Sequence, residues 1–414
     1  MKVVFLFLTI LVSVISVEGQ VIQWRGPERD GHFNEKGLLK QWPDEGPRQV
    51  LEVEGLGKGY SSPIVTGNTI YVTGMKDTLD YLTAIDFSGN VRWQVPYGRS
   101  WNKSFPETRC SPTIDGDRVY VLSGLGKLSC MNAQSGALIW SVDVDKIYQA
   151  EYHEWGVAES PLVVDDKVIC SPGGRVTSVV AFDKMTGKAV WQSEPVGGPR
   201  SYVSPTVYKY NSIRYILAAT ASHLIALNPE SGKIAWTYKY FDADKWKWQN
   251  NGVIWTNTPL YRGNEIFVYI GYDYPAVMLQ MDPSGNSVSE KYRNTTLDTH
   301  HHGAILVDGY VYGSNWISNG KGKWVCMDWE TGAIKYETDW NNKGSIVYAD
   351  GMLYVYEEKG GNVGLVKPNP EKWEVVSSFK VTKGSGPHWA HPFISNGKLY
   401  LRHGEVLLVY DIKA

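Results

Sequence analysis

A turn motif that recurs along the chain constrains the fold more than any other feature of this 414-residue sequence. A full copy, such as "AFDKMTGKAVW" ending at Trp191, reads as a strand, a tight Asp- or Asn-led turn with a glycine, and a strand ending in an aromatic residue. The glycine supplies the positive φ of a hairpin turn, so each copy predicts a β-hairpin. The motif glycines, spaced 45 to 53 residues apart, are Gly89, Gly136, Gly187, Gly232, Gly285 and Gly332.

A second motif lies upstream of the turns and occurs eight times. It consists of a strand that opens with small residues, a short turn, and a strand rich in aromatic residues, as in "CSPTIDGDRVYVLSG". The copies begin at Ser61, Cys110, Glu159, Val203, Asn257, His302, Lys343 and Ala390. Together the two motifs give units of four strands at roughly 40–50 residues, which is the pattern of propeller blades. We therefore predict an all-β fold: a single eight-bladed β-propeller of four-stranded blades over residues 20–414.

The last copy leaves only "VLLVYDIKA" before the end of the sequence, one strand short of a blade. The segment "RQVLEVEG", residues 48–55, precedes the first copy and can supply the missing strand. Pairing it with the last blade would close the ring and remove an open sheet edge. The prediction is thus a ring closed by an N-terminal strand.

The first residues have the features of a secretory signal peptide. Lys2 is followed by an apolar run from Val3 to Val17, and Gly19 follows shortly after. An apolar run of about 15 residues is short for a bilayer span, although an uncleaved membrane anchor is the alternative. We predict that residues 1–19 are a signal peptide, that no membrane span remains after its removal, and that the mature protein is periplasmic or secreted.

Charge and cysteine content narrow the function classes. A formal net charge of −2 gives no basic excess, so nucleic acid is not an expected partner. The four cysteines, Cys110, Cys130, Cys170 and Cys326, include no close pair, so a cysteine metal site is poorly supported. Export permits disulfides, but this spacing requires none.

These motifs resemble the pyrroloquinoline-quinone-like propeller repeat. The residues that bear the resemblance are the Gly turns, the Ser-Pro strands, the opening "WRGPERDG" at 24–31 and the "WAHP" stretch at 389–392. The opening and the C-terminal sequence are similar to a secreted bacterial subgroup labelled quinoprotein or alcohol-dehydrogenase-like. The resemblance implies the propeller fold but leaves the cofactor open, because the repeat occurs both in quinone dehydrogenases and in an outer-membrane assembly scaffold that binds no quinone.

The resemblance also implies what a quinone dehydrogenase of this shape would contain. Such enzymes typically have an adjacent Cys-Cys disulfide over the cofactor and a calcium ion held by Glu, Asn and Asp. No Cys-Cys pair occurs in this sequence, which is also shorter than those enzymes. Pyrroloquinoline quinone with calcium is therefore a cofactor that we do not favour, and the cofactor stays unassigned.

Three consecutive histidines, His300 to His302, end a loop that leads into the first strand of a blade. In a propeller the first strands surround the central channel, so residues at the equivalent position of each copy should meet at the channel mouth. A histidine acid or base beside a carboxylate and a guanidinium would suit proton transfer. The predicted catalytic residues are Arg109, Glu159, His302 and His391.

The loops that lead into the blades are long and rich in aromatic residues. Aromatic faces with polar rims suit sugar rings and other flat ligands, although such residues can also simply pack the loops together. The predicted ligand-binding residues are Tyr60, His153, Trp155, Tyr202, Trp255, Asn257, His301, Lys343 and Trp389. A metal ion is a further alternative: neighbours in an extended segment point opposite ways, so at most two of the three histidines could share one ion, with His153 or His391.

Three functions follow as hypotheses. The favoured one is an exported propeller that binds or acts on a carbohydrate, an oligosaccharide or a similar small molecule, for example by lyase chemistry on a uronic acid. The alternatives are a quinone-dependent alcohol or sugar dehydrogenase, and a non-catalytic scaffold with envelope proteins as partners. No nucleophile motif such as G-x-S-x-G is present, so whether the chain is an enzyme stays open.

Overall fold

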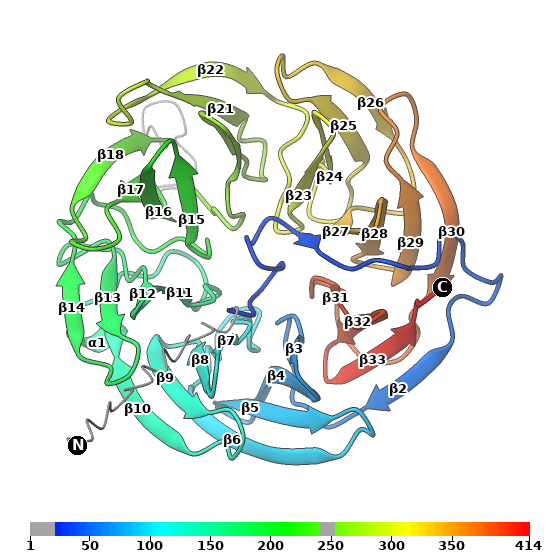
Figure 1. The fold of residues 1–414 in the computed structure, drawn as a ribbon, viewed down its shortest axis with the longest axis horizontal. Coiled ribbons are helices and arrows are strands. Elements are labelled where there is room, and N and C mark those ends of the chain that lie inside the picture. Colours follow the sequence, from blue (N-terminus) through cyan, green and yellow to red (C-terminus); the bar gives the residue numbers. More distant parts are fainter. Residues whose placement is uncertain (1–20, 241–252) are drawn as a thin grey trace, which may run out of the picture.

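The chain folds into a ring of eight β-sheets arranged like blades around one axis (Figure 1). The structure is a computed structural model that describes residues 21–240 and 253–414. Within these residues seven sheets have four strands and one has a fifth, and strands that follow one another within a blade pair antiparallel. The predicted eight-bladed, all-β propeller is confirmed. The predicted signal peptide lies outside the described residues.

The blades follow one another in chain order, each with its first strand nearest the axis (Figure 1). Blades one and two comprise β3 (Ile64–Thr66), β4 (Thr69–Lys76), β5 (Leu79–Asp86), β6 (Val91–Arg99), β7 (Thr113–Asp115), β8 (Arg118–Leu122), β9 (Lys127–Asn132) and β10 (Leu138–Asp143). Blades three and four comprise β11 (Leu162–Val164), β12 (Lys167–Cys170), β13 (Val180–Asp183), β14 (Ala189–Gln192), β15 (Thr206–Tyr210), β16 (Ile213–Ala219), β17 (His223–Leu227) and β18 (Ile234–Lys239).

The second half of the ring repeats this order. Blades five and six comprise β19 (Leu260–Arg262), β20 (Glu265–Val268), β21 (Ala276–Met281), β22 (Val288–Asn294), β23 (Ala304–Val307), β24 (Tyr310–Ser314), β25 (Trp324–Asp328) and β26 (Ile334–Thr338). Blades seven and eight comprise β27 (Gly344–Ala349), β28 (Met352–Glu357), β29 (Asn362–Lys367), β30 (Glu374–Lys380), β31 (Phe393–Ser395), β32 (Lys398–His403) and β33 (Val406–Asp411).

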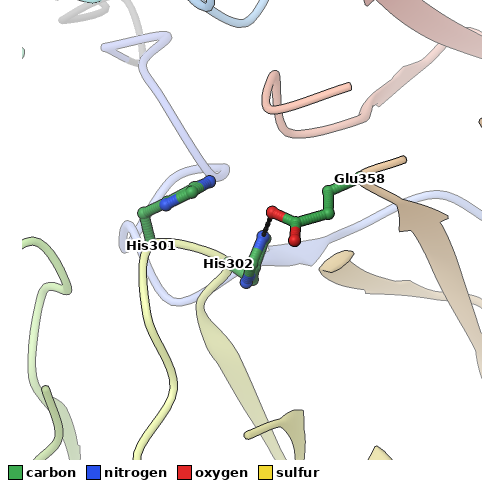
Figure 2. A group of neighbouring side chains, drawn as sticks. All are labelled: His301, His302 and Glu358. Atoms are coloured by element: carbon green, nitrogen blue, oxygen red, sulfur yellow. Dashed lines mark hydrogen bonds and ion pairs between the residues drawn. The ribbon is translucent and has the colours of Figure 1, made fainter. Parts of the chain in front are cut away.

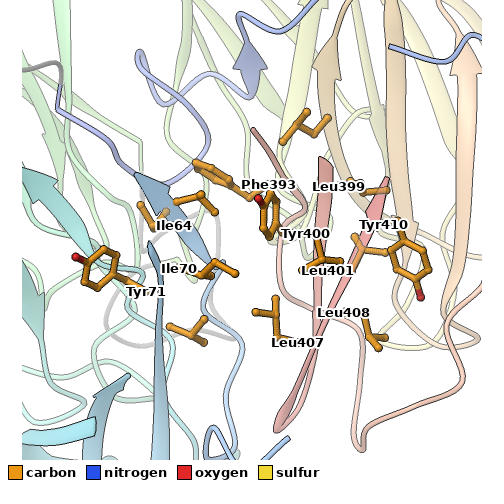
Figure 3. Close-up of a cluster of buried hydrophobic side chains, with 14 of the residues drawn as sticks. Ile64, Ile70, Tyr71, Phe393, Leu399, Tyr400, Leu401, Leu407, Leu408 and Tyr410 are labelled. Carbon is orange, nitrogen blue, oxygen red and sulfur yellow. The ribbon is translucent and has the colours of Figure 1, made fainter. Parts of the chain in front are cut away.

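Strand β2 (Gln49–Val53) completes blade eight as its outermost strand. It pairs antiparallel with β33, with Val53 opposite Leu407. This confirms the predicted closure of the ring by an N-terminal strand. An apolar core then continues across the junction: Ile64 and Ile70 of blade one and Phe393 of blade eight belong to a single buried cluster (Figure 3).

The tryptophans of the turn motif join each blade to the next. Trp93 donates a hydrogen bond from Nε1 to the Gln134 carbonyl of the following blade, at 2.9 Å. The ring lies on Gly136, where a Cβ would come within 2.6 Å of Trp93 Cε3. Trp140 and Trp191 lie in the same way on the turn glycines of the next two blades. The motif glycine thus provides both a positive φ and the space for an indole.

The N-terminal residues 22–33, which we call the axial segment, cross the central channel (Figure 1). Ile22 forms a bridge to Ile114 on one side, and β1 (His32–Phe33) pairs parallel with β27 on the other. The inner edges of the first strands would otherwise lack hydrogen-bonding neighbours. The axial segment was not anticipated from the sequence.

Two buried arginines tie the axial segment to the blades. Arg29 donates to the carbonyl oxygens of Ser160 and Pro205, at 2.9 Å each, and of Pro161, at 2.5 Å. Arg25 donates to the Ala304 and Ile346 carbonyls, at 2.8 and 3.0 Å. A guanidinium group has five N–H donors, which suits a ring of inward-facing carbonyls. The axial segment therefore closes the channel through the middle of the ring.

Helix is nearly absent from the described residues. The single α-helix there, α1 (Val144–Ile147), has four residues and lies between β10 and β11. No helix in the described part of the chain is long and apolar enough to cross a bilayer.

Candidate functional site

A cavity of about 340 Å³ lies at one mouth of the channel and is the candidate site. We call it the axial cavity. Loops from all eight blades meet there, together with Trp24 of the axial segment, so the closed channel forms its floor. The residues that line it are Trp24, Tyr60, Phe105, Arg109, Ser111, Trp155, Ala158, Ser160, Tyr202, Ser204, Thr256, Tyr272, His300, His301, Asn319, Glu358, Trp389 and His391.

Seven of the residues predicted from the sequence line this cavity. They are Tyr60, Arg109, Trp155, Tyr202, His301, Trp389 and His391. Six others, Glu159, His302, His153, Trp255, Asn257 and Lys343, do not line it. The predicted ring of catalytic and binding residues is therefore divided between the wall of the cavity and the layer behind it.

The alternation of an extended chain explains this division. Side chains of successive residues point to opposite sides. The residues three before the motif proline, such as Tyr60 and Arg109, face the cavity, and so do several directly before it, such as Ser111. The residues two before it, which include Glu159, Asn257, His302 and Lys343, point away from the cavity. The prediction located the correct segments but included this outward-pointing position.

Glu159 is buried within its own blade instead of at the cavity. Both carboxylate oxygens accept a hydrogen bond from the Ser171 backbone N–H, at 3.0 and 3.1 Å. Burial raises the pKa of Glu159 to about 7, against the opposing charges of Arg200 and Arg29. A group without access to the cavity cannot contact a ligand there, so the arrangement gives Glu159 a structural role.

Asn257 and Trp255 fix the loop that contains the three histidines. The Asn257 amide donates to the Thr299 carbonyl at 2.8 Å and accepts from the Gly303 N–H at 3.1 Å. Trp255 is fully buried and donates to the Asn257 carbonyl at 3.0 Å. These contacts orient the histidines from behind. His153 is half-buried and lies outside the cavity wall.

Glu358 connects the outer layer to the cavity. Its Oε2 accepts hydrogen bonds from His302 Nε2 and Trp389 Nε1, at 3.1 Å each, and its Oε1 lies 2.6 Å from Lys343 Nζ (Figure 2 shows the His302 contact). Lys343 is fully buried and also donates to the Ser318 and Asn319 carbonyls, at 3.0 Å each. Burial alone would raise the pKa of Glu358, but His302 and Lys343 lower it to about 2. Glu358 is thus ionised and neutralised by its neighbours.

The donor atoms of His301, His302 and Glu358 come within 4.8 Å of one another, so they must be considered as a metal site (Figure 2). Two of the three consecutive histidines do converge, but with Glu358 in place of His153 or His391. The carboxylate already accepts from His302 and Trp389 and forms an ion pair with the Lys343 ammonium at 2.6 Å. An ion there would have to displace a buried cation, so the residues fit a hydrogen-bonded ion pair better than a metal.

His391 has neither ring nitrogen free. Arg25 Nη1 can only donate, so its 3.0 Å contact makes His391 Nδ1 an acceptor. The ring proton then lies on Nε2, which donates to the His301 carbonyl at 2.9 Å. Burial and the charge of Arg25 hold the pKa of His391 well below its ordinary value. In this arrangement His391 positions His301, and its predicted part in catalysis stays a prediction.

His300 and His301 present unpaired nitrogens beside the cavity. His300 Nδ1 and His301 Nε2 are buried and have no hydrogen-bond partner among the described residues. The His300 ring lies edge-on to Tyr272 with centroids 4.6 Å apart, and His301 lies edge-on to Trp389 at 5.1 Å. Burial lowers the pKa of His300 to about 3 and holds that of His301 well below its ordinary value. Both rings are therefore neutral hydrogen-bonding groups at neutral pH.

Sequence reasoning missed Glu358, Tyr272 and Asn319, which line the cavity from a second set of loops. These loops join the second and third strands within a blade: β20 to β21, β24 to β25 and β28 to β29. The second strand of an antiparallel blade returns to the face from which the first strand started, so both sets of loops reach the same mouth. That topology was the signal that could have located them.

The sequence is similar to a propeller family and to parts of two quinoprotein dehydrogenases. A family model described as "Outer membrane protein assembly factor BamB" matches residues 79–317. The quinohemoprotein alcohol dehydrogenase ADH-IIG of Pseudomonas putida is 27% identical over 203 residues, covering 45% of this chain and 27% of that protein. The quinoprotein glucose dehydrogenase of Escherichia coli (strain K12) is 24% identical over 250 residues, covering 45% of this chain and 31% of that protein. The matches thus span about a third or less of these relatives.

Solved structures share the architecture. BamB from Moraxella catarrhalis superposes with a TM-score of 0.60 at 16% identity, covering 88% of this chain and 99% of that one. A europium-containing methanol dehydrogenase superposes with a TM-score of 0.68 at 15% identity, covering 91% of this chain and 88% of that one. At these identities the likeness establishes the fold.

Proposed function

The chain belongs to the β-propeller family whose model is described as outer membrane protein assembly factor BamB, and from that premise we propose that it binds a carbohydrate in the axial cavity. The observation that supports this most is the composition of the wall. Seven aromatic side chains surround the cavity: Trp24, Tyr60, Phe105, Trp155, Tyr202, Tyr272 and Trp389. Aromatic faces pack against the C–H faces of sugar rings, and cavities of this size are typical of small-molecule sites.

Five of these aromatic residues, Tyr60, Phe105, Trp155, Tyr202 and Trp389, form a continuous belt. Trp389 lies 4.8 Å from Tyr60 between ring centroids, and 6.0 Å from Phe105. Phe105 in turn contacts Trp155, which packs on Tyr202 at 5.7 Å. Phe105 is 55% exposed, so one side of the belt is open to solvent. An apolar belt with an open rim admits a ring-shaped ligand from the loop face of the propeller.

Polar side chains of the wall can supply the hydrogen bonds that a sugar needs. The neutral imidazoles of His300 and His301 each offer one N–H and one lone pair. A hydroxyl group can both donate and accept, which matches this mixed capacity.

The residues present do not fit pyrroloquinoline quinone with calcium. Calcium takes six to eight oxygen ligands, commonly from several carboxylates and amides. Among the described residues of the wall the only carboxylate is Glu358, and Lys343 and His302 already neutralise it. The four cysteines are buried and unpaired, and none is adjacent to another. The proposed site is therefore one for a ligand that brings no calcium.

A scaffold for envelope proteins is the second candidate function. It is favoured by the family description, which names an assembly factor of the outer membrane. Under either proposal the mature protein acts in the periplasm or outside the cell. The two functions place the binding site in different parts of the molecule. A small ligand would bind in the axial cavity, whereas a partner protein would bind on an outer surface.

The test is isothermal titration of the purified mature chain with neutral and acidic oligosaccharides, and separately with pyrroloquinoline quinone plus calcium. We expect a saccharide to bind. Its affinity should fall by at least about tenfold in Trp389→Ala, because one stacking face disappears. Trp93→Ala is the matched control: it removes a half-buried indole between blades, and should lower the Tm without changing the affinity. Binding of the quinone and no saccharide, or equal affinity in Trp389→Ala, would contradict the proposal.

A further inference from the structure

We infer that the carbohydrate ligand bears a carboxylate, as in a uronic acid, and that Arg109 and Tyr202 bind this group on one wall of the axial cavity. This inference rests on the proposed function and adds the chemical class of the ligand. It is drawn from the distribution of charge around the cavity and from one phenol whose proton has no acceptor.

Arg109 is a cation in an apolar wall without a carboxylate partner. Among the described residues no ion pair joins it to an acid, and its guanidinium donates only to the backbone carbonyls of Phe105 and Glu107. Its Cζ lies 5.9 Å from the ring centroid of Tyr60. Burial lowers the pKa of Arg109, and electrostatic interactions with Tyr60, Tyr202, Glu107 and Asp80 oppose this effect only in part. A guanidinium has five donors, so several remain to hold an anion.

Tyr202 provides a second donor beside Arg109. Its phenol oxygen accepts two hydrogen bonds, from the backbone N–H groups of Glu154 at 3.0 Å and Trp155 at 2.8 Å. Its own proton has no acceptor among the described residues, although Tyr202 is only 5% exposed. Burial raises the pKa of Tyr202, while the two N–H groups and the charge of Arg109 lower it. The phenol is thus a neutral, polarised donor next to a cation.

Among the described residues, the rest of the cavity wall offers Arg109 no carboxylate of its own. The single carboxylate, Glu358, is paired with Lys343 at 2.6 Å and with His302 at 3.1 Å. The imidazoles of His300, His301 and His391 are neutral because burial lowers their pKa. The cavity therefore has one cationic wall and one neutral wall. A pyranose that bears a carboxylate matches both, since its ring and hydroxyls face the aromatic belt and the histidines.

A neutral sugar would leave the Arg109 charge desolvated and unpaired, which is unfavourable in a water-poor cavity. A planar carboxylate also matches the fork of a guanidinium, and the Tyr202 phenol can donate to the same oxygens. Selection for the acid over its neutral counterpart should therefore be large, because it combines a charge-assisted hydrogen bond with relief of an uncompensated charge.

The experiment compares D-glucuronate and D-galacturonate with D-glucose, D-galactose and the uronate methyl esters by isothermal titration. We expect the acids to bind about 10- to 100-fold more tightly than either neutral set. Arg109→Gln should remove this preference, because acid and neutral sugar then meet the same uncharged wall, and Tyr202→Phe should reduce it. Arg99→Gln is the matched control, since Arg99 is exposed on β6, away from the cavity wall.

The outcomes separate the two proposals. Equal affinity for uronates, esters and hexoses would overturn the carboxylate inference and leave carbohydrate binding in place. Retention of the full preference in Arg109→Gln would also overturn it. No binding of any sugar would overturn the proposed function, and this inference with it. If Arg109→Gln does not fold, the comparison of acid with methyl ester on the unaltered protein decides alone.

Discussion

Lys343 shows how a residue that never meets the ligand can determine the shape of its site. Its buried ammonium donates to two carbonyls of one intra-blade loop and forms an ion pair with Glu358, which in turn accepts from the Trp389 indole. Removing one partner of a buried ion pair leaves the other charge uncompensated. Lys343 therefore supports both the fold of the cavity wall and the position of an aromatic residue in the belt.

Replacing Lys343 by methionine should lower the free energy of unfolding by about 3–5 kcal/mol, because Glu358 is left charged and buried. Chemical denaturation monitored by circular dichroism measures this change. Lys323→Met is the control: Lys323 pairs with Glu337 at 3.5 Å, and both side chains are about one-third exposed, so its loss should cost less than about 1 kcal/mol. Equal losses of unfolding free energy in the two variants would show that the buried Lys343–Glu358 pair stabilises the fold no more than an exposed pair does.

The buried histidines should make stability depend on pH. The pKa of His300 falls from its ordinary 6.5 to about 3 on folding, chiefly through burial. The unfolded chain therefore binds protons that the folded chain cannot, so the contribution of His300 is intact above about pH 6.5 and is lost progressively as the pH falls toward 3. The urea midpoint should fall across this range, and His300→Gln should flatten the slope. An unchanged slope in the variant would contradict the assignment.

Among the structural elements, the axial segment stabilises the ring as a strand would, although only His32–Phe33 of it form a strand. Its two arginines contact six blades. Arg29 donates to carbonyls of blades three and four and to the Thr113 hydroxyl of blade two. Arg25 donates to carbonyls of blades six and seven and to the His391 ring of blade eight. Both arginines adopt positive φ, near 60°, which lets one short segment direct side chains to opposite sides. The floor of the cavity exists because this segment fills the channel.

Arg29→Met should therefore destabilise the fold by at least about 3 kcal/mol, because carbonyls of two neighbouring blades lose their charged donor in a dry channel. Equilibrium unfolding in guanidinium chloride is the measurement. Arg175→Met is the control, since Arg175 is 93% exposed and its pair with Glu151 should contribute less than about 1 kcal/mol. A loss in Arg29→Met no greater than in this control would mean that water replaces the guanidinium.

At the scale of the whole molecule, periodicity explains why so much was predictable. Each blade repeats the same strand and turn chemistry, so the Gly136 and Gly187 turns and the β2–β33 closure follow from local patterns. The axial segment has no repeat partner, and its contacts to Pro161 and Ile346 join residues more than a hundred positions apart. No local pattern encodes such contacts, so the floor of the cavity could not be derived in advance.

The site was likewise predictable only where it follows from the repeat. The loops that reach the channel mouth followed from the order of strands, which located Tyr60, Arg109, His301 and Trp389. Which member of each loop faces inward depends on an alternation that begins at an unknown residue, so Glu159 and Lys343 were included among the inward-facing ones. Glu358 was not among the predicted residues, because its loop between β28 and β29 belongs to the second set, which the sequence analysis did not assign to the channel mouth.

We propose that the ring of loops encloses a carbohydrate site on the propeller axis. The most direct measurement is a crystal structure of the mature chain with the uronate that binds most tightly in titration. We expect electron density for one sugar ring between the aromatic belt and His301, with its carboxylate on Arg109 and Tyr202. Density on the outer strands of the blades, with the axial cavity filled only by water, would contradict it.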